Sequence, residues 1–452
     1  MALLPGAALA HAAQSGFVLL LPTGIYIAAG CATVAATALI VALLPGGALS
    51  ALFRPHCLFP LPDLGAARTV TSLASLALLG LLVVAGFLGP HDPLSNPLPL
   101  AIWTLWWIGL VSAQGVLGNL WAWVSPWNGA ARLMAGGGAR LPEGLGQWPA
   151  VVLFLLAMAF ALADPAPDAP DRLATVVLGY ALLTLAGVAL FGAEWLARAE
   201  CFTVLLRWFA RLAPVQLERE ARLGLPGWRA LETPVPATSG AVFLLVLLGT
   251  GSFDGLNDTF WWLARIGINP LAFPGRSEIV GPTVAGLLAV NGCLVAAFWG
   301  CTTLGCLLVR RFAPESGRVS FGTAFRSLAV SILPIAFGYH VAHFLTTFLV
   351  NGQYALIALG DPLATGADLL GLGQFYVTTG FFNTRDTVRV IFLSQAGAIV
   401  LAHVLGVLMA HRISHDLFPG RRAALLGQIP LALFMVAYTL LGLWLLAAPR
   451  GV

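Results

Sequence analysis

The sequence predicts an all-α fold: a polytopic bundle of about ten transmembrane helices with both termini on the periplasmic side. Three observations support this fold class. Hydrophobic residues make up 59% of the 452 residues and charged residues only 9%, which is more apolar surface than a soluble protein can bury. The chain contains uncharged runs of roughly 20 residues, the length needed to cross about 30 Å of hydrocarbon. Arginines also concentrate in alternate loops, as the positive-inside rule requires.

The predicted helices follow one another along the chain. The expected spans are 24–44, 69–89, 97–118, 147–163, 173–193, 238–253, 281–309, 327–350, 389–411 and 426–447. All 23 basic residues are arginines, and with an outer N-terminus 17 of them lie in inner loops and 6 in outer loops. We therefore expect a multi-pass protein of the bacterial cytoplasmic (inner) membrane, in contact with membrane lipid. The net charge of +4 gives no reason to expect a nucleic-acid partner, and partner subunits are left open.

The chain is expected to form a single transmembrane helical domain, 24–447, after an N-terminal outer segment, 1–23. The residues ALA at 8–10 followed by His11 resemble a degenerate signal-peptidase site, although ten residues is shorter than an ordinary signal peptide. Cleavage there would expose His11, whose imidazole and free amine could together bind a metal ion. The alternative is an unprocessed segment on the outer surface.

Three segments between the spans are unusually long. Residues 194–232 form the largest inner segment, in which RAECFTVLLRWFARL resembles an amphipathic helix. Its apolar side chains, among them Trp208 and Phe209, are expected to enter lipid. Residues 254–280 and 351–388 are expected to be outer loops. Loops of this length without regular structure are candidate lids or binding loops.

Ionisable side chains inside the predicted spans are few, and their cost in a bilayer makes them candidate functional groups. His340 and His343 lie in the eighth span, and they share one helix face with Thr347 and Asn351. His403 lies in the ninth span. The helix rise places His343 roughly 10 Å, His340 roughly 15 Å and His403 about 20 Å below the outer surface. The three imidazoles are therefore expected at similar depths.

Two carboxylates are expected near these imidazoles. Asp254 and Asp258 start an outer loop at a matching height and are candidate catalytic groups. Imidazoles three residues apart on a helix can bind one metal ion, leaving room for a carboxylate and a water, and such an ion activates water near neutral pH. The alternative is that the histidines bond to neighbouring helices and stabilise packing. His411 and His415, beside Asp416, are expected to lie at a solvated inner helix end.

Several stretches resemble a family of bacterial multi-span membrane proteins known as fenitrothion hydrolases. They are LAHAAQSG, NPLPLAIWTLWWIGLV, NLWAWVSPW, SFDG at 252–255, LARIGINPLAFPGRS, YHVAHFLTTFLVNGQY and LAHVLGVLMAH. The resemblance covers nearly the whole chain and implies the family's fold and a phosphotriester-cleaving activity. The family's recurrent positions that match here are His11, Asp254, His340, His343 and His403.

The favoured function is a metal-dependent hydrolase with an outward-opening site for a small-molecule substrate. In this hypothesis His340 and His343 bind a zinc, copper or iron ion, together with His403 as a third ligand or as a partner of a ligand. Asp254 is a ligand or the general base, and His11 is a further candidate ligand. Two alternatives remain: a haem- or copper-binding electron-transfer or metal-handling protein with His340 and His403 as ligands, and a small-molecule transporter.

Overall fold

The computed structural model describes residues 18, 20–44, 46–134, 139–269, 275–373 and 375–450. These residues are mainly helical, which confirms the all-α class. By their internal contacts they group into two compact units. Unit 1 comprises Met1–His56, Leu223–His343 and Gly380–Val452, and unit 2 comprises Cys57–Arg222 and Phe344–Thr379.

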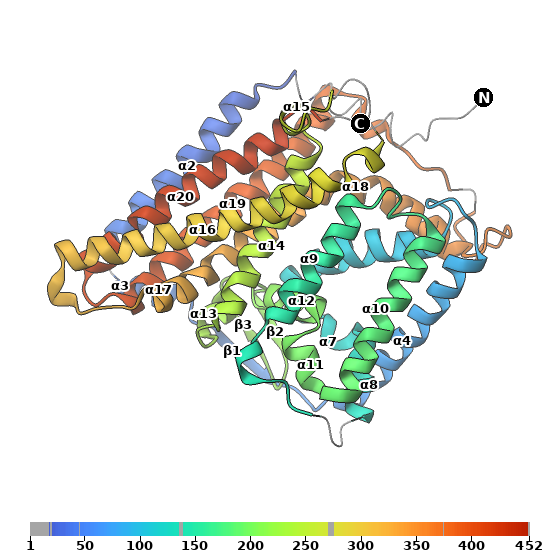
Figure 1. Ribbon diagram of the computed structural model, residues 1–452, viewed down its shortest axis with the longest axis horizontal. Helices are drawn as coiled ribbons and strands as arrows, with labels where there is room; N and C mark the ends of the chain where they lie inside the picture. The colour runs from blue at the N-terminus through green and yellow to red at the C-terminus, as the bar shows by residue number, and fades with distance from the viewer. Residues whose placement is uncertain are drawn as a thin grey trace. The chain divides into compact units, whose positions relative to one another are not determined.

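Unit 1 contains the N-terminal and C-terminal helices of the chain. Its elements are α2 (Thr23–Leu43), α3 (Gly46–Leu52), α13 (Trp228–Glu232), α14 (Thr238–Asn257), α15 (Phe260–Arg265), η4 (Arg276–Glu278), α16 (Val280–Phe312), η5 (Pro314–Ser316), α17 (Phe321–Leu328), η6 (Ala329–Ile332), the first part of α18 (Leu333–Gly360), η7 (Gly380–Phe382), α19 (Arg385–Leu417) and α20 (Arg421–Ala447). Helices α2, α16 and α19 each lie beside α20 (Figure 1).

Close packing in unit 1 depends on small residues where helices meet. A Cβ atom at Gly305 of α16 would lie 2.2 Å from the carbonyl oxygen of Gly427 on α20. The two backbones are therefore in direct contact, as expected where small residues face each other between apolar helices. At Gly30 of α2 an added Cβ would lie 2.6 Å from the Leu443 side chain. These contacts bring three apolar helices, α2, α16 and α20, together in one bundle.

Unit 2 contains the segment between α3 and α13. Its elements are β1 (His56–Pro60), α4 (Gly65–Leu88), α5 (Pro97–Pro99), the π-helical η1 (Leu100–Leu110), α6 (Val111–Leu117), α7 (Trp121–Val124), α8 (Pro126–Leu133), η2 (Glu143–Leu145), α9 (Trp148–Ala163), α10 (Pro170–Phe191), α11 (Ala193–Arg198), α12 (Cys201–Ala210), β2 (Val215–Leu217), β3 (Glu220–Leu223) and the second part of α18. The strands form one small sheet in the order β1-β3-β2.

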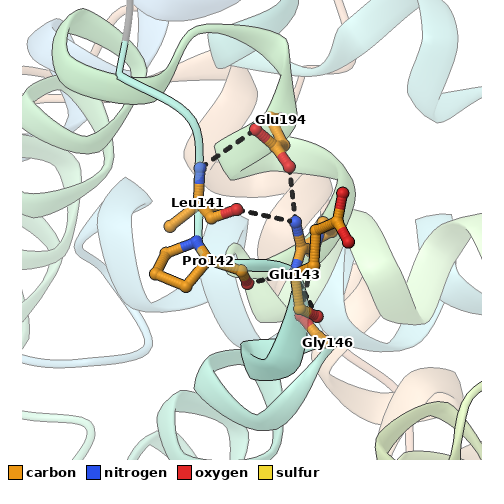
Figure 2. Close-up of polar contacts among 6 residues, drawn as sticks. Leu141, Pro142, Glu143, Gly146 and Glu194 are labelled. Carbon is orange, nitrogen blue, oxygen red and sulfur yellow. Dashed lines mark hydrogen bonds and ion pairs between the residues drawn. The ribbon is translucent and has the colours of Figure 1, made fainter.

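One arginine holds a loop of unit 2 in place. Figure 2 shows the contacts of Glu194 and of the loop that precedes α9. The guanidinium of Arg198 donates hydrogen bonds to the backbone carbonyl oxygens of Leu141, Pro142, Glu143 and Gly146. It also forms an ion pair with Glu194, four residues earlier. A planar guanidinium offers five donors in a fixed geometry, so this single side chain satisfies much of the loop's backbone.

Nine helices in the described ranges are long and apolar enough to cross a membrane. They are Thr23–Leu43, Gly65–Leu88, Pro97–Leu117, Pro170–Phe191, Thr238–Asn257, Val280–Phe312, Phe321–Gly360, Arg385–Leu417 and Arg421–Ala447. The remaining predicted span, 147–163, which is the fourth along the chain, is the apolar helix α9, which has 16 residues and is shorter than the roughly 20 residues that a span needs. By length and composition, these helices are those of a multi-pass membrane protein. The number of ten spans stays a prediction.

The predicted outer loops are shorter than expected. Helix α14 continues to Asn257, so Asp254 lies in its last turn rather than at the start of a loop. Helix α18 continues to Gly360 and α19 begins at Arg385, which leaves 361–384 between them instead of 351–388. Sequence-based limits placed the ends at charged or polar residues. The structure instead keeps Asp254 and Asn351 helical.

The inner segment 194–232 also differs from the prediction. It folds into α11, α12, β2, β3 and α13. The apolar side chains of α12 expected to enter lipid are buried, with exposed fractions of 4% at Trp208 and 3% at Phe209. Helix α12 packs against α6, α9 and α11 of the same unit. Its hydrophobic face therefore belongs to the interior of unit 2.

Candidate functional site

The candidate site forms where α14 and α18 of unit 1 meet. The Nε2 atom of His343 lies 3.1 Å from Oδ2 of Asp254. The side chains of these residues are only 11% and 22% exposed. At this distance the imidazole N–H donates a hydrogen bond to the carboxylate, or forms an ion pair with it when protonated. The structure thus brings together two groups that lie 89 positions apart in the sequence.

Tyr339 places the imidazole against α14. Its ring is stacked on His343, with centroids 5.7 Å apart and an angle of 14° between the planes. The ring lies over two glycines of α14: an added Cβ would lie 3.3 Å from Cδ1 at Gly251 and 1.9 Å from the hydroxyl oxygen at Gly255. Only glycine leaves room for the ring at Gly255. This spacing of four residues forms a shallow surface that lets α18 approach Asp254 closely.

Asp258 and Arg450 add charge next to this pair. Arg450 follows α20 and pairs with Thr259 in an antiparallel bridge, while the Phe260 N–H donates to the carbonyl oxygen of Pro449 at 3.1 Å. The Arg450 guanidinium interacts electrostatically with both Asp254 and Asp258. Sequence reasoning missed Arg450, because an arginine after the last span carries no signal beyond its side of the membrane.

The carboxyl group of Asp258 holds its proton more tightly than an ordinary aspartate. Its low-dielectric surroundings raise its pKa, and the neighbouring Asp254 carboxylate raises it further. Arg450 and Arg276 oppose this effect, and the Asp258 residue itself is exposed. The two carboxyl groups therefore differ in their surroundings. Asp254 has the imidazole as its direct partner, whereas Asp258 binds a proton more tightly than an ordinary aspartate.

His340 lies one helical turn before His343 and belongs to the same group. Its side chain is buried, with 8% exposed, and its charge when protonated acts on Asp254. The predicted pairing of His340 and His343 on one face of α18 therefore does place both imidazoles near Asp254. Together Asp254, Asp258, His340 and His343 form the part of the predicted site that the structure brings together.

His403 lies deeper in the bundle than His343, as the predicted depths of about 20 Å and roughly 10 Å imply. On α19 the Gln395 amide donates to the Ala342 carbonyl oxygen at 2.8 Å, which fixes the level of α19 beside His343. His403 follows Gln395 by eight residues, or about 12 Å along the helix. Its Nδ1 lies 2.8 Å from the carbonyl oxygen of Ile399 in its own helix. The structure therefore does not bring His403 to the level of His343.

A metal centre at this site stays a prediction. Among the described residues, no group of three or more histidine, cysteine, aspartate or glutamate side chains is placed to hold a metal ion. His11, a candidate ligand, lies outside the described residues. The donor set that the geometry provides is the pair Asp254 and His343. A catalytic zinc site usually has three protein ligands, one more than this pair provides.

The packing of α18 on α19 does not favour haem between His340 and His403. A Cβ atom at Gly338 would lie 2.3 Å from Cβ of Ala402 and 2.9 Å from the carbonyl oxygen of Ala398. The two helices therefore touch within two residues of each histidine. A porphyrin held between two axial histidines must fit between their helices, and backbone contact leaves no such gap at this level.

Polar residues next to the site tie the surrounding helices together. Ser252 and Tyr438 share a buried hydrogen bond of 2.6 Å between α14 and α20. Asn291 of α16 donates to the hydroxyl oxygen of Thr250 at 3.1 Å and to the Leu287 carbonyl oxygen at 2.8 Å. The Ser252–Tyr438 and Asn291–Thr250 bonds hold α14 against α20 and α16 within about one turn of Asp254.

The arrangement is suited to moving a proton. A carboxylate that accepts a hydrogen bond from an imidazole fixes the ring's orientation and stabilises its protonated form, and a nearby arginine can stabilise negative charge that develops on a substrate.

Known proteins give no relative to compare with this site. The chain matches no family model, no curated protein and no solved structure.

Proposed function

We propose that the protein is a membrane-embedded hydrolase in which the Asp254–His343 pair is the general base. The observation that supports this proposal is the 3.1 Å contact between Nε2 of His343 and Oδ2 of Asp254. A positioned imidazole that accepts a proton from water typically accelerates hydrolysis by about 10²–10⁴-fold. The carboxylate keeps the ring in one orientation and stabilises the imidazolium formed in the reaction.

The proposed reaction is attack of water on an uncharged phosphate triester. One O–H bond of the water breaks, its proton passes to the imidazole of His343, and a new P–O bond forms. The ester P–O bond then breaks, and the alcohol leaves with the proton that His343 returns. Arg450 stabilises the negative charge on the phosphoryl oxygen during attack. The family resemblance supports this substrate class, and an uncharged triester is apolar enough to reach a site among apolar helices.

The site is proposed to open toward the periplasm of a bacterial inner membrane, with both termini on that side. The distribution of arginines supports this orientation: 17 lie in the loops assigned to the inner side and 6 in those assigned to the outer side. A metal-dependent variant of the reaction would use His340 and His343 as ligands, with His11 or Asp254 beside them.

Proton-coupled transport of a small molecule is a second candidate. The observation that favours it is that Asp254 and His343 both lie inside helices long and apolar enough to span a membrane. Carboxylate and imidazole groups inside transmembrane helices commonly relay protons in transporters. In this case protonation of the pair would accompany substrate passage, and no bond of the substrate would break.

Hydrolysis of a 4-nitrophenyl dialkyl phosphate by the purified protein in nanodiscs tests the first proposal, with release of 4-nitrophenolate as the signal. Asp254→Asn and His343→Gln are expected to lower kcat by at least 100-fold. Asp171→Asn and His91→Gln, which change exposed residues of unit 2, are matched controls and should leave the rate unchanged. Hydrolysis that persists in both site variants would refute the general-base role.

Two further measurements separate the alternatives. Treatment with a chelator, followed by elemental analysis, distinguishes the metal-dependent reaction, which stops and resumes when metal is added back, from the metal-free one. Uptake of an unmodified solute into proteoliposomes, driven by a pH gradient and lost in Asp254→Asn, would establish transport instead. Absence of both hydrolysis and flux in the wild-type protein contradicts both candidate functions.

A further inference from the structure

A second pair of histidines lies at the other end of α19. His411 and His415 are four residues apart and therefore share one face of the helix. Their rings are 4.5 Å apart between centroids and meet at 68°. The sequence predicted a solvated helix end here, but this prediction was wrong for His411, which is only 1% exposed. His415 is half-buried.

Gln428 of α20 orients the first imidazole. Its side-chain carbonyl oxygen Oε1 lies 3.0 Å from Nδ1 of His411. Because this oxygen only accepts hydrogen bonds, Nδ1 carries the hydrogen and Nε2 carries the lone pair. Histidines that bind metals in proteins are generally held in this way, with the non-ligating nitrogen donating to an oxygen acceptor.

The two Nε2 atoms have no hydrogen-bond partner. Those of His411 and His415 are both buried, and no donor or acceptor in the described part of the chain contacts either of them. Leaving a buried polar atom without a partner costs about 1–3 kcal/mol. This cost applies to two atoms on the same face of α19. Two adjacent imidazole nitrogens that both lack a partner point to a ligand that both of them contact.

The surrounding charges are largely neutralised by their own partners. Arg412 and Asp416 form an ion pair on the same helix. Arg421, the first residue of α20, donates to the carbonyl oxygens of Ala42 and Leu43 at 3.3 and 3.2 Å, where the end of α2 attracts positive charge. Both arginines and Asp416 interact electrostatically with His415.

We propose that His411 and His415 bind one divalent transition-metal ion through their Nε2 atoms. Two imidazoles one helical turn apart on one face are the spacing that holds zinc in helical metal sites. Centroids of two imidazoles on one tetrahedral ion are about 5 Å apart, given metal–nitrogen bonds of about 2.0–2.1 Å. The 4.5 Å separation reaches this value by a small rotation of the half-buried His415.

The chemistry of the pair determines which ion binds best. Two neutral nitrogen donors bind Cu²⁺ more tightly than Ni²⁺ or Zn²⁺. With no third histidine, cysteine or carboxylate in the described residues placed to complete the site, water fills the remaining positions. The site is separate from the Asp254–His343 pair, because His411 lies 16 residues beyond Gln395 on α19, about 24 Å along the helix.

Copper titration of the full-length protein tests this proposal. The measurements use a background with His11→Ala and His343→Ala, so that copper bound at the N-terminus or at the hydrolytic site does not contribute. We expect one Cu²⁺ per chain, with hyperfine structure from two nitrogen ligands in the electron paramagnetic resonance spectrum, and weaker binding of Zn²⁺. Failure to bind Cu²⁺ at micromolar concentration would overturn the proposal without bearing on hydrolysis.

Single variants identify the ligands. His411→Ala and His415→Ala are each expected to weaken Cu²⁺ binding by at least 100-fold, whereas His56→Ala and His91→Ala, which change exposed histidines, should not weaken it. His415 is half-buried, so its variant is expected to fold even if the His411 variant does not. Unchanged copper affinity in a folded His415→Ala protein contradicts the assignment.

Gln428 provides a test of positioning. Gln428→Leu removes the acceptor of the Nδ1–H and is expected to lower Cu²⁺ affinity by about 10–100-fold while the two-nitrogen spectrum persists. Gln428→Glu, which restores a stronger acceptor, should recover or exceed the wild-type affinity. Equal Cu²⁺ affinities for the Leu and Glu variants would show that Gln428 only packs between α19 and α20. They would contradict its role in orienting His411 for metal binding.

Discussion

The hydroxyl group of Tyr339 lies directly over the Cα atom of Gly255. A Cβ atom at Gly255 would lie 1.9 Å from the hydroxyl oxygen and 3.2 Å from Cζ. The same tyrosine ring is stacked on His343. A single missing methyl group on α14 therefore determines where the imidazole lies relative to Asp254.

Gly255→Ala is expected to destabilise the protein by about 1–3 kcal/mol, because the added methyl group overpacks the contact. It should also slow hydrolysis, since the tyrosine that supports His343 must move. Thermal unfolding in detergent and the 4-nitrophenolate assay measure the two effects. Gly292→Ala is the matched control: it lies within α16, where an added Cβ meets nothing within 4 Å, and should stabilise the helix by roughly 0.5–1 kcal/mol.

The double variant Gly255→Ala/Tyr339→Phe tests the cause of that loss. Removing the hydroxyl oxygen eliminates the shortest contact and leaves the 3.2 Å approach to Cζ as the shortest one. Part of the lost stability should therefore return. If the double variant is less stable than Gly255→Ala, steric conflict with the hydroxyl group is not the reason for the destabilisation.

Asp258→Asn is expected to change how stability depends on pH. The pKa of Asp258 is raised in the folded protein above its ordinary value of 3.8, so the folded state binds the proton more tightly than the unfolded state. This contribution is fully present below the unfolded pKa and is lost as pH rises through the folded pKa. The unfolding temperature of Asp258→Asn, relative to wild type, should therefore increase from pH 4 to pH 7. A constant difference would contradict the raised pKa.

Asp361→Asn should show the opposite dependence. The backbone N–H groups of Thr365 and Gly366 donate to the Asp361 carboxylate at 2.9 and 2.6 Å, and these bonds lower its pKa. Its stabilising contribution is therefore present above the unfolded pKa and lost as pH falls through the folded pKa. The variant should unfold at a lower temperature than wild type at pH 7, with a smaller difference in acid.

Arg198→Lys is expected to lower the stability of unit 2 by about 2 kcal/mol. The lysine keeps the positive charge but cannot reproduce the fork of donors that contacts four carbonyl oxygens, and hydrogen bonds to charged groups contribute about 1.5–3 kcal/mol each. Chemical denaturation measures the change. Arg172→Ala removes an ion pair whose arginine side chain is 51% exposed and should cost less than about 1 kcal/mol. Equal costs would show that the fork geometry is unimportant.

Gln395→Leu tests the register of α19 on α18. The Gln395 amide is buried and donates to the Ala342 carbonyl oxygen at 2.8 Å, so its loss should cost about 1 kcal/mol and slow hydrolysis by displacing the neighbouring His343. The adjacent Ser394→Ala changes an exposed residue and should alter stability by less than about 0.5 kcal/mol. Hydrolysis at the wild-type rate in Gln395→Leu would separate this contact from the site.

The positions of the helices could be predicted from the sequence, whereas several of their ends could not. Each predicted span coincides with a helix, because uncharged runs of this length have few other stable arrangements in a bilayer. Helix α14 continues past 253 because Asp254 has an imidazole partner, which a search for uncharged runs cannot detect. The apolar face of α12 indicated only that either lipid or protein must cover it. In the structure, other helices of unit 2 cover it.

Part of the candidate site could also be predicted from the sequence. Buried ionisable groups are rare enough that Asp254, His340 and His343 stand out in the sequence. The residues of α18 that lie level with His403 depend on the register between the two helices, which the small residues Gly338 and Ala402 set by contact. Such contacts between distant residues leave no periodic pattern along the chain.

Partners supplied by other helices were also missed. Arg450 reaches the carboxylates through a bridge to Thr259, and Gln428 orients His411 from the neighbouring helix. Neither residue differs locally from an ordinary flanking arginine or glutamine. Their roles depend on tertiary contacts that a single sequence does not reveal.

The loop held by Arg198 has a consequence for limited proteolysis. The Leu141 N–H donates to Glu194 and its carbonyl oxygen accepts from Arg198, so the residue after Arg140 is fixed on both sides. Trypsin cleaves only where several consecutive residues can extend into its active-site cleft, and exposed mobile segments are its preferred targets. The Arg140–Leu141 bond is therefore protected in the native protein, and its cleavage reports loss of the guanidinium contacts.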